Sequence, residues 1–224
     1  LIKSDLHKGP LSGKTITITA GPTREPIDPV RNISNNSSGK MGYALADAAR
    51  LQGANVNLVS GPVSLTANKG INLFKINSAD EMLNKVFECM ESSDIFISCA
   101  AVADFKPTNY SNTKIKKEDS ENLEINFQKN HDSLSEVSKR HSPAYIVGFA
   151  AETSNVNDNA NKKLNSKNLN MIISNDVSDK SIGFDSDDNE VHVITKNETI
   201  FLKKNKKIKI AREILNIIAL NTKS

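Results

Sequence analysis

The fold of this chain is constrained most by a regular alternation of short β-branched apolar runs with longer segments of helical spacing, which continues to about Ile173. This alternation is typical of repeated β-α units, in which parallel strands form one sheet and helices cover its faces. It predicts an α/β fold with a mostly parallel sheet. The expected strands are 15–20, 55–60, 71–76, 94–100, 144–150 and 171–174, and the expected helices are 39–52, 78–92, 132–140, 155–167 and 206–220.

The pattern changes beyond Asp176, where two alternating runs, "NEVHVIT" and "ETIFLKK", flank a polar "KN" pair. Two such runs around a short polar turn predict an antiparallel hairpin, which the last helix follows. The chain has 224 residues with a hydrophobic fraction of 38%, which is enough for one proper core. We therefore expect residues 14–224 to form one domain.

Composition excludes several classes of function. The net charge is +3 and the lysines are interleaved with Asp, Glu and Asn, so the basic stripe of a nucleic-acid binder is absent, while anionic small molecules suit this charge. No apolar run approaches ~20 residues and the first residues lack the apolar core of a signal peptide, so we expect no membrane association.

Two cysteines without metal-ligand spacing, Cys89 and Cys99, fit a reducing cytoplasm. The histidines show no i,i+3 or i,i+4 pairs, so the sequence identifies no metal ligands.

Two connections exceed the usual length of about 2–6 residues between elements of an α/β fold. The first, residues 20–42, reads "AGPTREPIDPVRNISNNSSGKMG" and contains almost nothing that could enter a core. The second, residues 105–128, is rich in lysine and lies between an expected strand and an expected helix. We expect the second connection to be a lid over a ligand, an arm at an interface between chains, or both.

The end of the first connection has the chemistry of a phosphate loop. Ligands of open α/β sheets bind beyond the carboxyl ends of the strands. Here "SNNSSGKMG" supplies hydroxyls, amides and a glycine just before a helix, whose free N–H groups and dipole attract phosphate. It is not a Walker A loop, because Ser34 and Met41 replace the required Gly and Ser or Thr, and it is not GxGxxG. A solvated turn is the alternative explanation of such a cluster, but its position before a helix favours phosphate.

Three further positions near strand ends are ambiguous. Asp104, in "AAVADFKP", either caps a helix or belongs to the wall of a nucleotide site. Phe149, in "GFAAET", either packs in the core or stacks on a base. Lys163 and Lys167, one helical turn apart, either share an anion or form a solvated face. The residues by themselves leave each pair of alternatives open.

Taken together, the motifs resemble a known family. The chain carries, in order, "ITAGPTREPIDPVRNISNNSSGKMG", "AAVADFKP", "KIKK", "VGFAAET", "KNLN" and "NDVS…GFDSDDNEV". This series resembles bacterial phosphopantothenoylcysteine synthetase, also called phosphopantothenate-cysteine ligase, of coenzyme A biosynthesis, from about Thr15 to Leu220. The resemblance implies a Rossmann-like, mostly parallel sheet flanked by helices, with a C-terminal β-hairpin and an inserted flap or dimerisation arm.

The activity that the resemblance implies is a CTP-dependent ligation. The carboxylate of phosphopantothenate attacks the α-phosphate of CTP, pyrophosphate leaves, and the amine of cysteine attacks the acyl-cytidylate and releases CMP. Because a carboxylate is a poor electrophile, it must first become a mixed anhydride, which requires positive charge and a metal ion around the triphosphate. The implied ligands are CTP with Mg²⁺, phosphopantothenate and cysteine.

The resemblance also assigns residues by motif. Asn35 corresponds to the family's asparagine at the acyl-cytidylate carbonyl, Lys114 to the arm lysine that serves formation of the intermediate, and Arg31 to a substrate-site arginine. The expected substrate site further comprises Ser37, Ser38, Gly39 and Ala101. The expected nucleotide site comprises Ser98, Cys99, Ala100, Asp104, Lys114, His131, Asp132, Ser133, Leu134, Phe149, Lys163 and Lys167.

The sequence departs from the family pattern at four positions. His131 replaces the usual Pro, and Asn170 replaces an Asp after "KNL". Asn32 and Asn36 replace an aromatic residue and a variable one. We therefore expect the outline of the nucleotide site to hold, while its individual contacts stay open.

The start of the chain suggests a larger protein. It begins at Leu1 with a polar segment that contains Gly9 and Pro10, so we expect residues 1–13 to be a linker. Bacterial members of the family are commonly fused to an upstream flavin-dependent decarboxylase, so we expect FMN only in such an upstream domain, and a larger assembly in that case. Family members also form dimers in which the arm reaches across, so we expect a homodimer.

Two other functions fit parts of the pattern. An NAD(P)-dependent oxidoreductase would use the same sheet, but the chain lacks GxGxxG, and its Tyr-x-x-x-Lys pair, Tyr110 and Lys114, lies on no expected helix. A catalytically silent nucleotide-binding or assembly module would fit the start of the chain. Binding of CTP with Mg²⁺, without binding of NADPH, would separate the ligase from the oxidoreductase.

Overall fold

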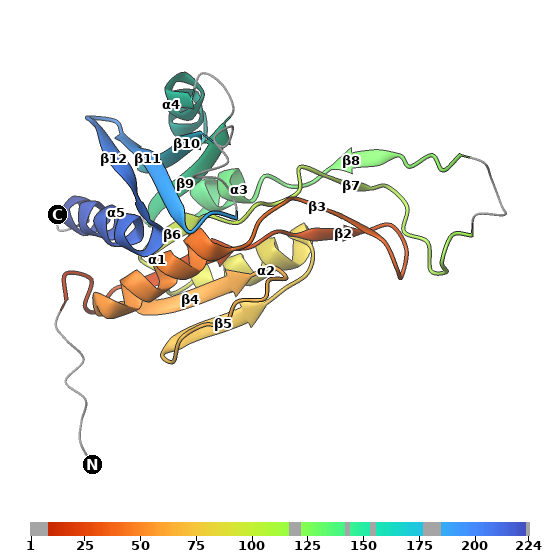
Figure 1. Ribbon diagram of the computed structural model, residues 1–224, viewed down its shortest axis with the longest axis horizontal. Helices are drawn as coiled ribbons and strands as arrows, with labels where there is room; N and C mark the ends of the chain where they lie inside the picture. The colour runs from red at the N-terminus through yellow and green to blue at the C-terminus, as the bar shows by residue number, and fades with distance from the viewer. Residues whose placement is uncertain (1–8, 117–121, 142–143, 153–155, 177–184, 223–224) are drawn as a thin grey trace, which may run out of the picture.

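One sheet runs through the middle of the molecule, with helices on both of its faces (Figure 1). The computed structural model describes residues 9–116, 122–141, 144–152, 156–176 and 185–222. The strands of the sheet are β1 (Thr15–Ala20), β4 (Asn55–Ser60), β5 (Ile71–Lys75), β6 (Ile95–Ser98), β9 (Tyr145–Glu152), β10 (Met171–Asp176), β11 (Asp188–Thr195) and β12 (Thr199–Lys206). Their order across the sheet is β12-β11-β10-β9-β6-β1-β4-β5.

The directions of the strands confirm the expected parallel sheet and the expected hairpin. From β5 to β10, all neighbouring strands pair in parallel. β10 pairs antiparallel with β11, and β11 with β12. β1 lies between β4 and β6, so successive units are added to opposite sides of β1, and the connections diverge at its carboxyl end. Ligands of doubly wound sheets bind at such a switch point.

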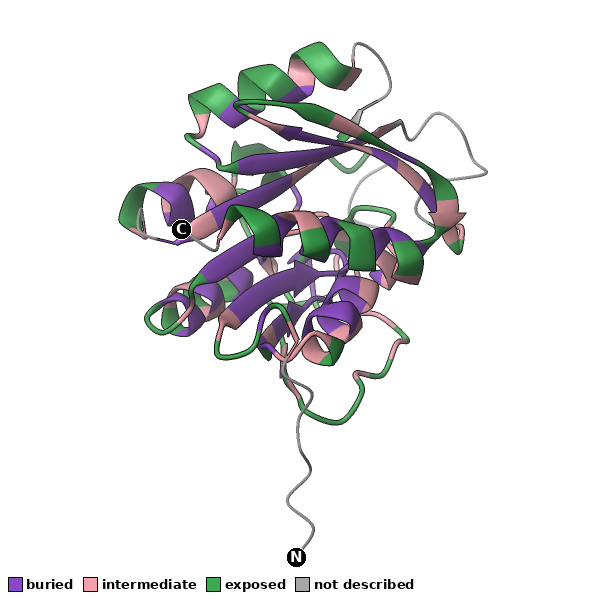
Figure 2. Ribbon diagram, turned by 90° about the vertical axis from the view of Figure 1, so that its left-hand side faces the viewer, coloured by how far each residue is buried: buried purple, intermediate pink, exposed green. Residues whose placement is uncertain are grey.

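The five described helices divide between the two faces. α1 (Lys40–Leu51) and α5 (Lys207–Asn221) cover one face, and α2 (Ala79–Met90), α3 (Ser133–Arg140) and α4 (Val156–Ser166) cover the other. The strands supply apolar side chains to both faces: Ile95 and Ile97 join the first core, Phe96 joins the second, and all three are fully buried. Figure 2 shows buried strands enclosed by partly exposed helices, so the fold has three layers around two apolar cores.

The start of α2 follows from a capping sequence. The hydroxyl of Ser78 accepts from the N–H of Glu81 at 3.2 Å, and the Glu81 carboxylate accepts from the N–H of Asn77 at 2.8 Å. Met82 and Val86 are fully buried one turn apart on the inner face. The first contact satisfies an N–H group that the helix itself leaves without a partner, and the second holds the residue before the cap, so Ser78 and Glu81 both act at the helix start as their spacing predicts.

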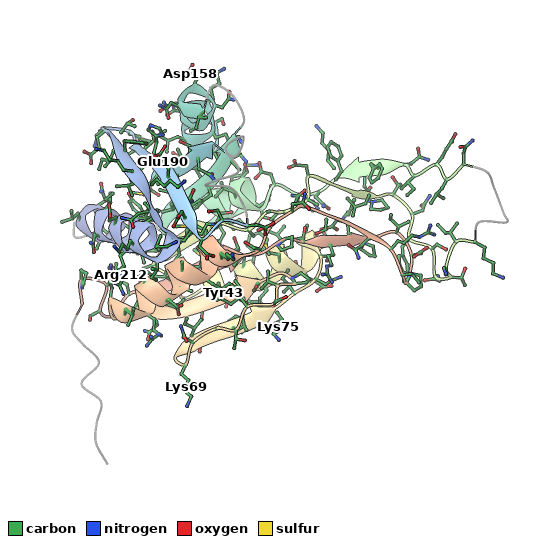
Figure 3. The ribbon with its side chains drawn as sticks, in the orientation of Figure 1. Tyr43, Lys69, Lys75, Asp158, Glu190 and Arg212 are labelled. Carbon is green, nitrogen blue, oxygen red and sulfur yellow. The ribbon has the colours of Figure 1, made fainter. Side chains whose placement is uncertain are left out.

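α1 packs very close to the sheet. A Cβ on Gly42 would stand 2.5 Å from the Cβ of Ala20, so a side chain at this position would push the helix off β1. The neighbouring Tyr43 (Figure 3) is buried, and its hydroxyl lies 3.2 Å from that of Ser60 at the end of β4. These two residues bring the start of α1 up to the carboxyl edge of the sheet.

Part of the segment expected to be a linker packs against this body. Leu11 is fully buried, and its N–H donates to the carbonyl oxygen of Gln52 at 3.1 Å. Residues 1–8 lie outside the described residues. The core of the domain therefore includes a side chain that precedes residue 14.

Both long connections contain short strands that the sequence pattern does not predict. β2 (Arg24–Pro26) pairs with β3 (Asn32–Ser34), and β7 (Phe105–Pro107) pairs with β8 (Phe127–Lys129), each antiparallel. The two hairpins extend together away from the sheet (Figure 1). Residues 105–129, which include β7 and β8, are called the arm below; residues 117–121 lie outside the described residues.

Charged side chains fix the base of both hairpins to the first turn of α2. The buried carboxylate of Glu25, on β2, accepts from the N–H of Ala79 at 2.9 Å. The ammonium of Lys106, on β7, pairs with Asp80 at 2.5 Å. A carboxylate at a helix N-terminus is favoured by the free N–H groups there, so α2 acts as an anchor for both projections.

A second link joins the hairpins further out. The buried carboxylate of Asp28 accepts from Arg31 Nε at 3.0 Å and from the N–H of Ile115, on the arm, at 3.2 Å. Arg31 in turn donates to the carbonyl oxygen of Ile115 at 3.1 Å. Hydrogen bonds from Arg31 hold the pKa of Asp28 well below its usual value, so the carboxylate stays charged. The β2–β3 loop and the arm therefore form one projecting unit.

Candidate active site

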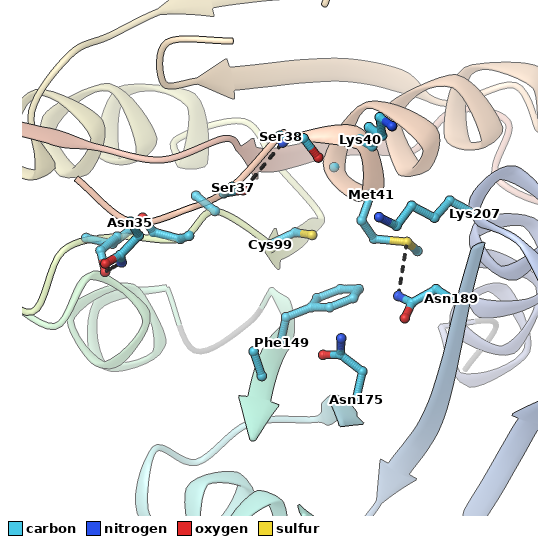
Figure 4. Close-up of a pocket in the computed structure, with 16 residues that line it drawn as sticks. Asn35, Ser37, Ser38, Lys40, Met41, Cys99, Phe149, Asn175, Asn189 and Lys207 are labelled. Carbon is cyan, nitrogen blue, oxygen red and sulfur yellow. Dashed lines mark hydrogen bonds between the residues drawn. The ribbon is translucent and has the colours of Figure 1, made fainter. Parts of the chain in front are cut away.

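A cavity of about 260 Å³ opens at the carboxyl edge of the sheet, beside the switch point between β1 and β6 (Figure 4). Residues from seven elements or loops meet there, which places it where the strand order predicts a ligand. The lining residues are Asn35, Ser37, Ser38, Gly39, Lys40, Met41, Gly42, Cys99, Ala100, Ala101, Val102, Phe149, Ala151, Asn175, Asn189 and Lys207.

One wall of the cavity is the start of α1. Gly39 precedes the helix with a φ of 75°, a left-handed conformation that favours glycine, and no side chain caps the helix. The N–H groups of the first helical residues have no intrahelical partner and carry the positive end of the helix dipole. This wall can bind an anion, as the motif "SNNSSGKMG" predicts.

The floor of the cavity is backbone that a threonine holds in place. Where β6 ends, the Thr19 hydroxyl oxygen accepts from the N–H groups of Cys99 and Ala100, each at 3.1 Å. Thr19 is buried near the carboxyl end of β1, and the sequence analysis did not identify it. Burial raises the pKa of the Cys99 thiol to about 12, so this lining group is neutral. The floor is therefore a rigid, uncharged surface of small residues.

Asn35, at the start of the loop that joins β3 to α1, is hydrogen-bonded to this floor. Its amide Nδ2 donates to the carbonyl oxygens of Val102, at 3.0 Å, and Ala101, at 3.3 Å. One residue earlier, the Ser34 hydroxyl donates to the carbonyl oxygen of Thr23 at 2.8 Å. The expected catalytic amide thus lies at the mouth of the cavity, oriented by two carbonyl groups.

The far side of the cavity carries Phe149 and three residues that the sequence analysis missed. Phe149, on β9, packs against the first core and lines the cavity, and its stacking on a base stays a prediction. Asn175, Asn189 and Lys207 complete this side (Figure 4). They come from β10, β11 and α5, and the signal that could have found them is their position at strand ends or helix starts on the same edge.

Other residues of the expected nucleotide site gather around the start of α3. Asp132 caps this helix by accepting from the N–H of Ser135 at 3.1 Å, and Lys167 pairs with Asp132 at 2.6 Å. Burial raises the pKa of Asp132, but the hydrogen bonds from Lys167 and Ser135 outweigh this effect and lower it overall. Ser133 is buried, and its hydroxyl has no hydrogen-bond partner within the described ranges. A polar ligand atom could satisfy this hydroxyl after a small local movement.

This second group adjoins the first through β9. A Cβ on Gly148 would lie 2.9 Å from Leu134 Cδ2, which places the first turn of α3 against the strand that carries Phe149. His131 borders a separate hollow of about 600 Å³ with Phe87 and Arg140. Of the nucleotide residues expected from the sequence, one group lines the cavity and another lies at the start of α3: Cys99, Ala100 and Phe149 in the first, and Asp132, Ser133, Leu134 and Lys167 in the second.

Several expectations about single residues were wrong or only partly right. Asp104 is exposed in a bend before β7, so it caps no helix. Lys167 has an acidic partner, Asp132, so Lys163 and Lys167 do not form a purely solvated face. β6 ends at Ser98, two residues earlier than expected, because Thr19 takes over the N–H groups that a longer strand would have paired.

Arg31 and Lys114 do not line the cavity of their own chain. Arg31 contacts Asp28 and Ile115 on the projecting unit, and Lys114 is exposed beside Ile115. Neither is among the lining residues given above. Of the three expected catalytic residues, the structure places Asn35 alone at the cavity.

The described part of the chain contains no group of three or more His, Cys, Asp or Glu residues that could hold a metal ion. Within the described ranges, no helix has the length and apolar character needed to cross a membrane.

Comparison with known proteins agrees with this arrangement. The chain is 47% identical over 214 residues to the Coenzyme A biosynthesis bifunctional protein CoaBC of Haemophilus influenzae, which covers 95% of the chain and 53% of that protein. It is 47% identical over 189 residues to the protein of the same name from Bacillus subtilis, covering 84% and 46%. The chain spans about half the length of the curated relatives it matches.

A solved structure and a family model cover almost the whole chain. The crystal structure of the C-terminal domain of Coenzyme A biosynthesis bifunctional protein CoaBC superimposes with a TM-score of 0.82 at 40% identity, covering 95% of this chain and 97% of that one. The family model "DNA/pantothenate metabolism flavoprotein C-terminal domain" matches residues 11–221. The chain therefore belongs to the family of DNA/pantothenate metabolism flavoprotein C-terminal domains.

Proposed function

We propose that this domain joins cysteine to phosphopantothenate at the expense of CTP, through an acyl-cytidylate, and yields phosphopantothenoylcysteine, CMP and pyrophosphate. The observation that carries the proposal is the cavity at the switch point, where the uncapped start of α1 lies next to Asn35 and the backbone floor after β6. Such a site can hold a phosphate at one end and a reacting carboxylate at the other. The family membership supports a place in coenzyme A biosynthesis.

The first step forms the mixed anhydride. With the phosphate of phosphopantothenate at the start of α1, its carboxylate extends towards Asn35 and attacks the α-phosphate of CTP, and pyrophosphate leaves. The nucleotide then lies between the floor after β6 and the start of α3, where the Ser133 hydroxyl and rigid backbone can contact the edge of the base. Mg²⁺ bound to the triphosphate belongs to the substrate and supplies charge neutralisation there.

The second step transfers the acyl group. The amine of cysteine attacks the acyl carbon, the C–O bond to the cytidylate breaks, and CMP leaves. An amide N–H of Asn35 directed at the acyl oxygen stabilises the developing negative charge by roughly 3–4 kcal/mol. In the ligand-free chain this amide donates to the carbonyl oxygens of Ala101 and Val102, so the substrate oxygen would compete with or share those bonds.

A complete site requires a second chain in this proposal. Arg31 and Lys114 lie on the projecting unit, outside the cavity of their own chain, so we propose a homodimer in which each arm closes over the cavity of its partner. We also propose that residues ahead of the domain link it to a flavin-containing decarboxylase, because the chain spans about half of relatives that are named bifunctional proteins. FMN would belong to that other domain, which would enlarge the assembly.

A direct assay tests the proposed function. CTP, Mg²⁺, phosphopantothenate and cysteine are incubated with the protein, and pyrophosphate release and the ligated product are followed together. During turnover both should appear in equal amounts, and sustained release of both should depend on all three substrates. Isothermal titration should show binding of CTP with Mg²⁺ and no binding of NADPH. A folded sample that binds NADPH, or that releases no pyrophosphate, would overturn the proposal.

A further inference from the structure

Thr23 is a buried polar residue that the proposed chemistry does not use. It lies between β1 and β2, in the polar stretch "AGPTREP", and is fully buried. A buried hydroxyl is costly unless it is hydrogen-bonded. The Thr23 hydroxyl oxygen accepts from the N–H of Ala103 at 3.0 Å, and Ala103 is itself only 4% exposed. This threonine therefore supplies an acceptor at a place that water barely reaches.

The N–H of Ala103 belongs to the same peptide group as the carbonyl oxygen of Val102. This peptide group is trans, so it is planar and its N–H and C=O point in opposite directions. On the side away from Thr23, the Val102 oxygen accepts from Asn35 Nδ2 at 3.0 Å. One rigid group thus joins the hydroxyl of Thr23 to the amide of Asn35.

Thr23 also holds the second acceptor of that amide. Asn35 Nδ2 donates to the carbonyl oxygen of Ala101 at 3.3 Å, and the N–H of Thr23 donates to the same oxygen at 3.4 Å. The carbonyl oxygen of Thr23 accepts from the hydroxyl of Ser34, the residue before Asn35, at 2.8 Å. Both acceptors of the Asn35 amide are therefore held by Thr23, one directly and one through a peptide group.

Other groups hold the two ends of the segment 101–103. The carbonyl oxygen of Ala103 accepts from Asn130 Nδ2 at 2.8 Å, and the N–H of Ala101 donates to the carbonyl oxygen of Gly21 at 2.9 Å. Without the threonine hydroxyl, the buried N–H of Ala103 would lose its acceptor, which favours rotation of its peptide group. Such a rotation would turn the Val102 oxygen away from the expected catalytic amide.

We propose that Thr23 is a positioning residue, which orients the Asn35 amide at the mouth of the cavity through the Val102–Ala103 peptide group (Figure 4). The inference rests on the proposed function, in which Asn35 serves acyl transfer to cysteine. An amide nitrogen carries two N–H groups, so anchoring one of them on Val102 leaves the other to point at the acyl oxygen. Thr23 is not among the lining residues of the cavity, so it acts through Asn35 rather than on the substrate.

Rapid-quench kinetics provide the first test. Thr23→Val keeps the shape of the side chain and removes the hydroxyl, and it should slow acyl transfer about 10-fold, because the amide remains but is misdirected. Formation of the acyl-cytidylate and the KM for CTP should stay near the wild-type values. Thr23→Ser keeps the hydroxyl and should restore acyl transfer. Thr17→Val is the matched control, since Thr17 is also fully buried and its hydroxyl lies 2.7 Å from that of Ser93, away from the cavity lining.

A double-mutant cycle separates positioning from a general structural role. In Asn35→Ala the amide is absent, so adding Thr23→Val should slow acyl transfer less than 2-fold, against about 10-fold in the wild-type background. Thermal unfolding checks that each variant folds, and Thr23→Cys, with a weakly accepting thiol, serves if Thr23→Val does not. Equal effects of Thr23→Val in both backgrounds, or unchanged acyl transfer in the folded variant, would overturn the inference.

Nuclear magnetic resonance of the side-chain amide of Asn35 separates this inference from the proposed function. Its signals are those lost in Asn35→Ala, and their exchange with water should be faster in Thr23→Val than in the wild type and in Thr17→Val. If the wild type ligates cysteine and Thr23→Val changes neither this exchange nor acyl transfer, the function stands and the role of Thr23 is wrong. If the wild type shows no ligation but the exchange depends on Thr23, the positioning stands and the proposed function fails.

Discussion

At the scale of single residues, Asn35 is the group whose chemistry is tied most closely to its contacts. Its amide donates to the carbonyl oxygens of Ala101 and Val102, so one side chain both joins two loops and faces the cavity. An aspartate here would place a carboxylate against two carbonyl oxygens. Any variant at this position therefore tests positioning and catalysis together, and the experiment must separate them.

We predict that Asn35→Asp slows acyl transfer to cysteine more than formation of the acyl-cytidylate, by about 10²- to 10³-fold, because a donor becomes an acceptor beside developing negative charge. Mass spectrometry of quenched reactions should show accumulated acyl-cytidylate. Asn36→Asp changes the neighbouring exposed amide in the same way and should have little effect. A block of CMP release without accumulated intermediate would show that Asn35 acts before the anhydride forms.

We predict that Lys114→Gln lowers the kcat for pyrophosphate release roughly 100-fold while CTP binding weakens much less, because its charge is needed mainly as the pyrophosphate departs. The preference for CTP over UTP should be unchanged, since a lysine charge does not distinguish bases and, in the proposed function, the backbone of Ser98 to Ala100 contacts the edge of the base. Lys116→Gln, at another exposed arm position, is the matched control. A variant that lost the CTP preference would place the arm at the base instead of at the triphosphate.

The site could be predicted in part from single residues. The loop of Asn35, Ser37, Ser38 and Gly39 was found because polar residues before a helix have a recognisable chemistry. Thr19 and Lys207 were missed because nothing local marks them: a threonine suits a strand, and a lysine suits a helix start at the surface. Their places in the site depend on residues about 80 positions away in the case of Thr19, and on burial in the case of Lys207.

At the scale of elements, the two hairpins behave as one projecting unit because their contacts with each other involve a buried charge. Asp28 and Arg31, on the β2–β3 loop, bind both backbone groups of Ile115 on the arm. The described arm residues have few apolar contacts of their own, so this link should control how firmly the arm is held.

We predict that Asp28→Asn releases residues 110–116, because a neutral amide cannot accept from the Arg31 guanidinium as the carboxylate does. Hydrogen exchange of this segment, corrected for the intrinsic rate, should be faster in the variant at pH 7. The pKa of Asp28 is lowered from 3.8, so the stabilisation of the arm by its carboxylate is complete above that value and is lost as the pH falls below it. The wild type should therefore approach the variant only below pH ~4.

Asp158→Asn, at an exposed position on α4, serves as the control for Asp28→Asn. It should leave the exchange of 110–116 at the wild-type rate. Equal protection of this segment in the wild type and in Asp28→Asn at pH 7 would show that other contacts hold the arm.

Long elements were predictable and short ones were not. Strand β1 and helix α2 each carry enough alternation or helical spacing to be recognised, and α2 also has its cap. β2, β3, β7 and β8 have three residues each, too few for any periodicity to appear. They form because distant segments pair with each other, which no local pattern records.

At the scale of the whole molecule, exposed apolar side chains concentrate on the projecting unit. Val30, Phe105, Tyr110, Leu123 and Phe127 are all between 48% and 63% exposed. Surfaces of this kind on a projection suit contact with another chain. They support the proposed homodimer, in which the arm of one chain supplies Lys114 to the cavity of the other.

We predict that mixing two inactive variants restores activity. Asn35→Asp lacks a working cavity and Lys114→Gln lacks a working arm. If the arm acts on the partner's cavity, a mixed dimer has one intact site, so about a quarter of all sites work after random exchange of subunits. If the arm acts on its own cavity, no site is intact and the mixture stays inactive. Sedimentation of the wild type should show dimers, and a monomer would exclude the arrangement.

The hairpin β11–β12 has a consequence for where the chain could be modified. β11 runs antiparallel to β10, and β12 runs antiparallel to β11, so β12 has the same direction as β10. It therefore ends at the carboxyl edge of the sheet, where α5 begins beside the cavity. After a single reversal, the helix that follows would have begun at the opposite edge of the sheet. Only an even number of reversals therefore brings the start of that helix to the cavity. The turn at Lys196 and Asn197, between β11 and β12, lies at the opposite edge of the sheet, at the far end of the hairpin from the cavity. A reporter peptide inserted at this turn should leave catalysis intact, because the turn lies at the edge of the sheet away from the cavity.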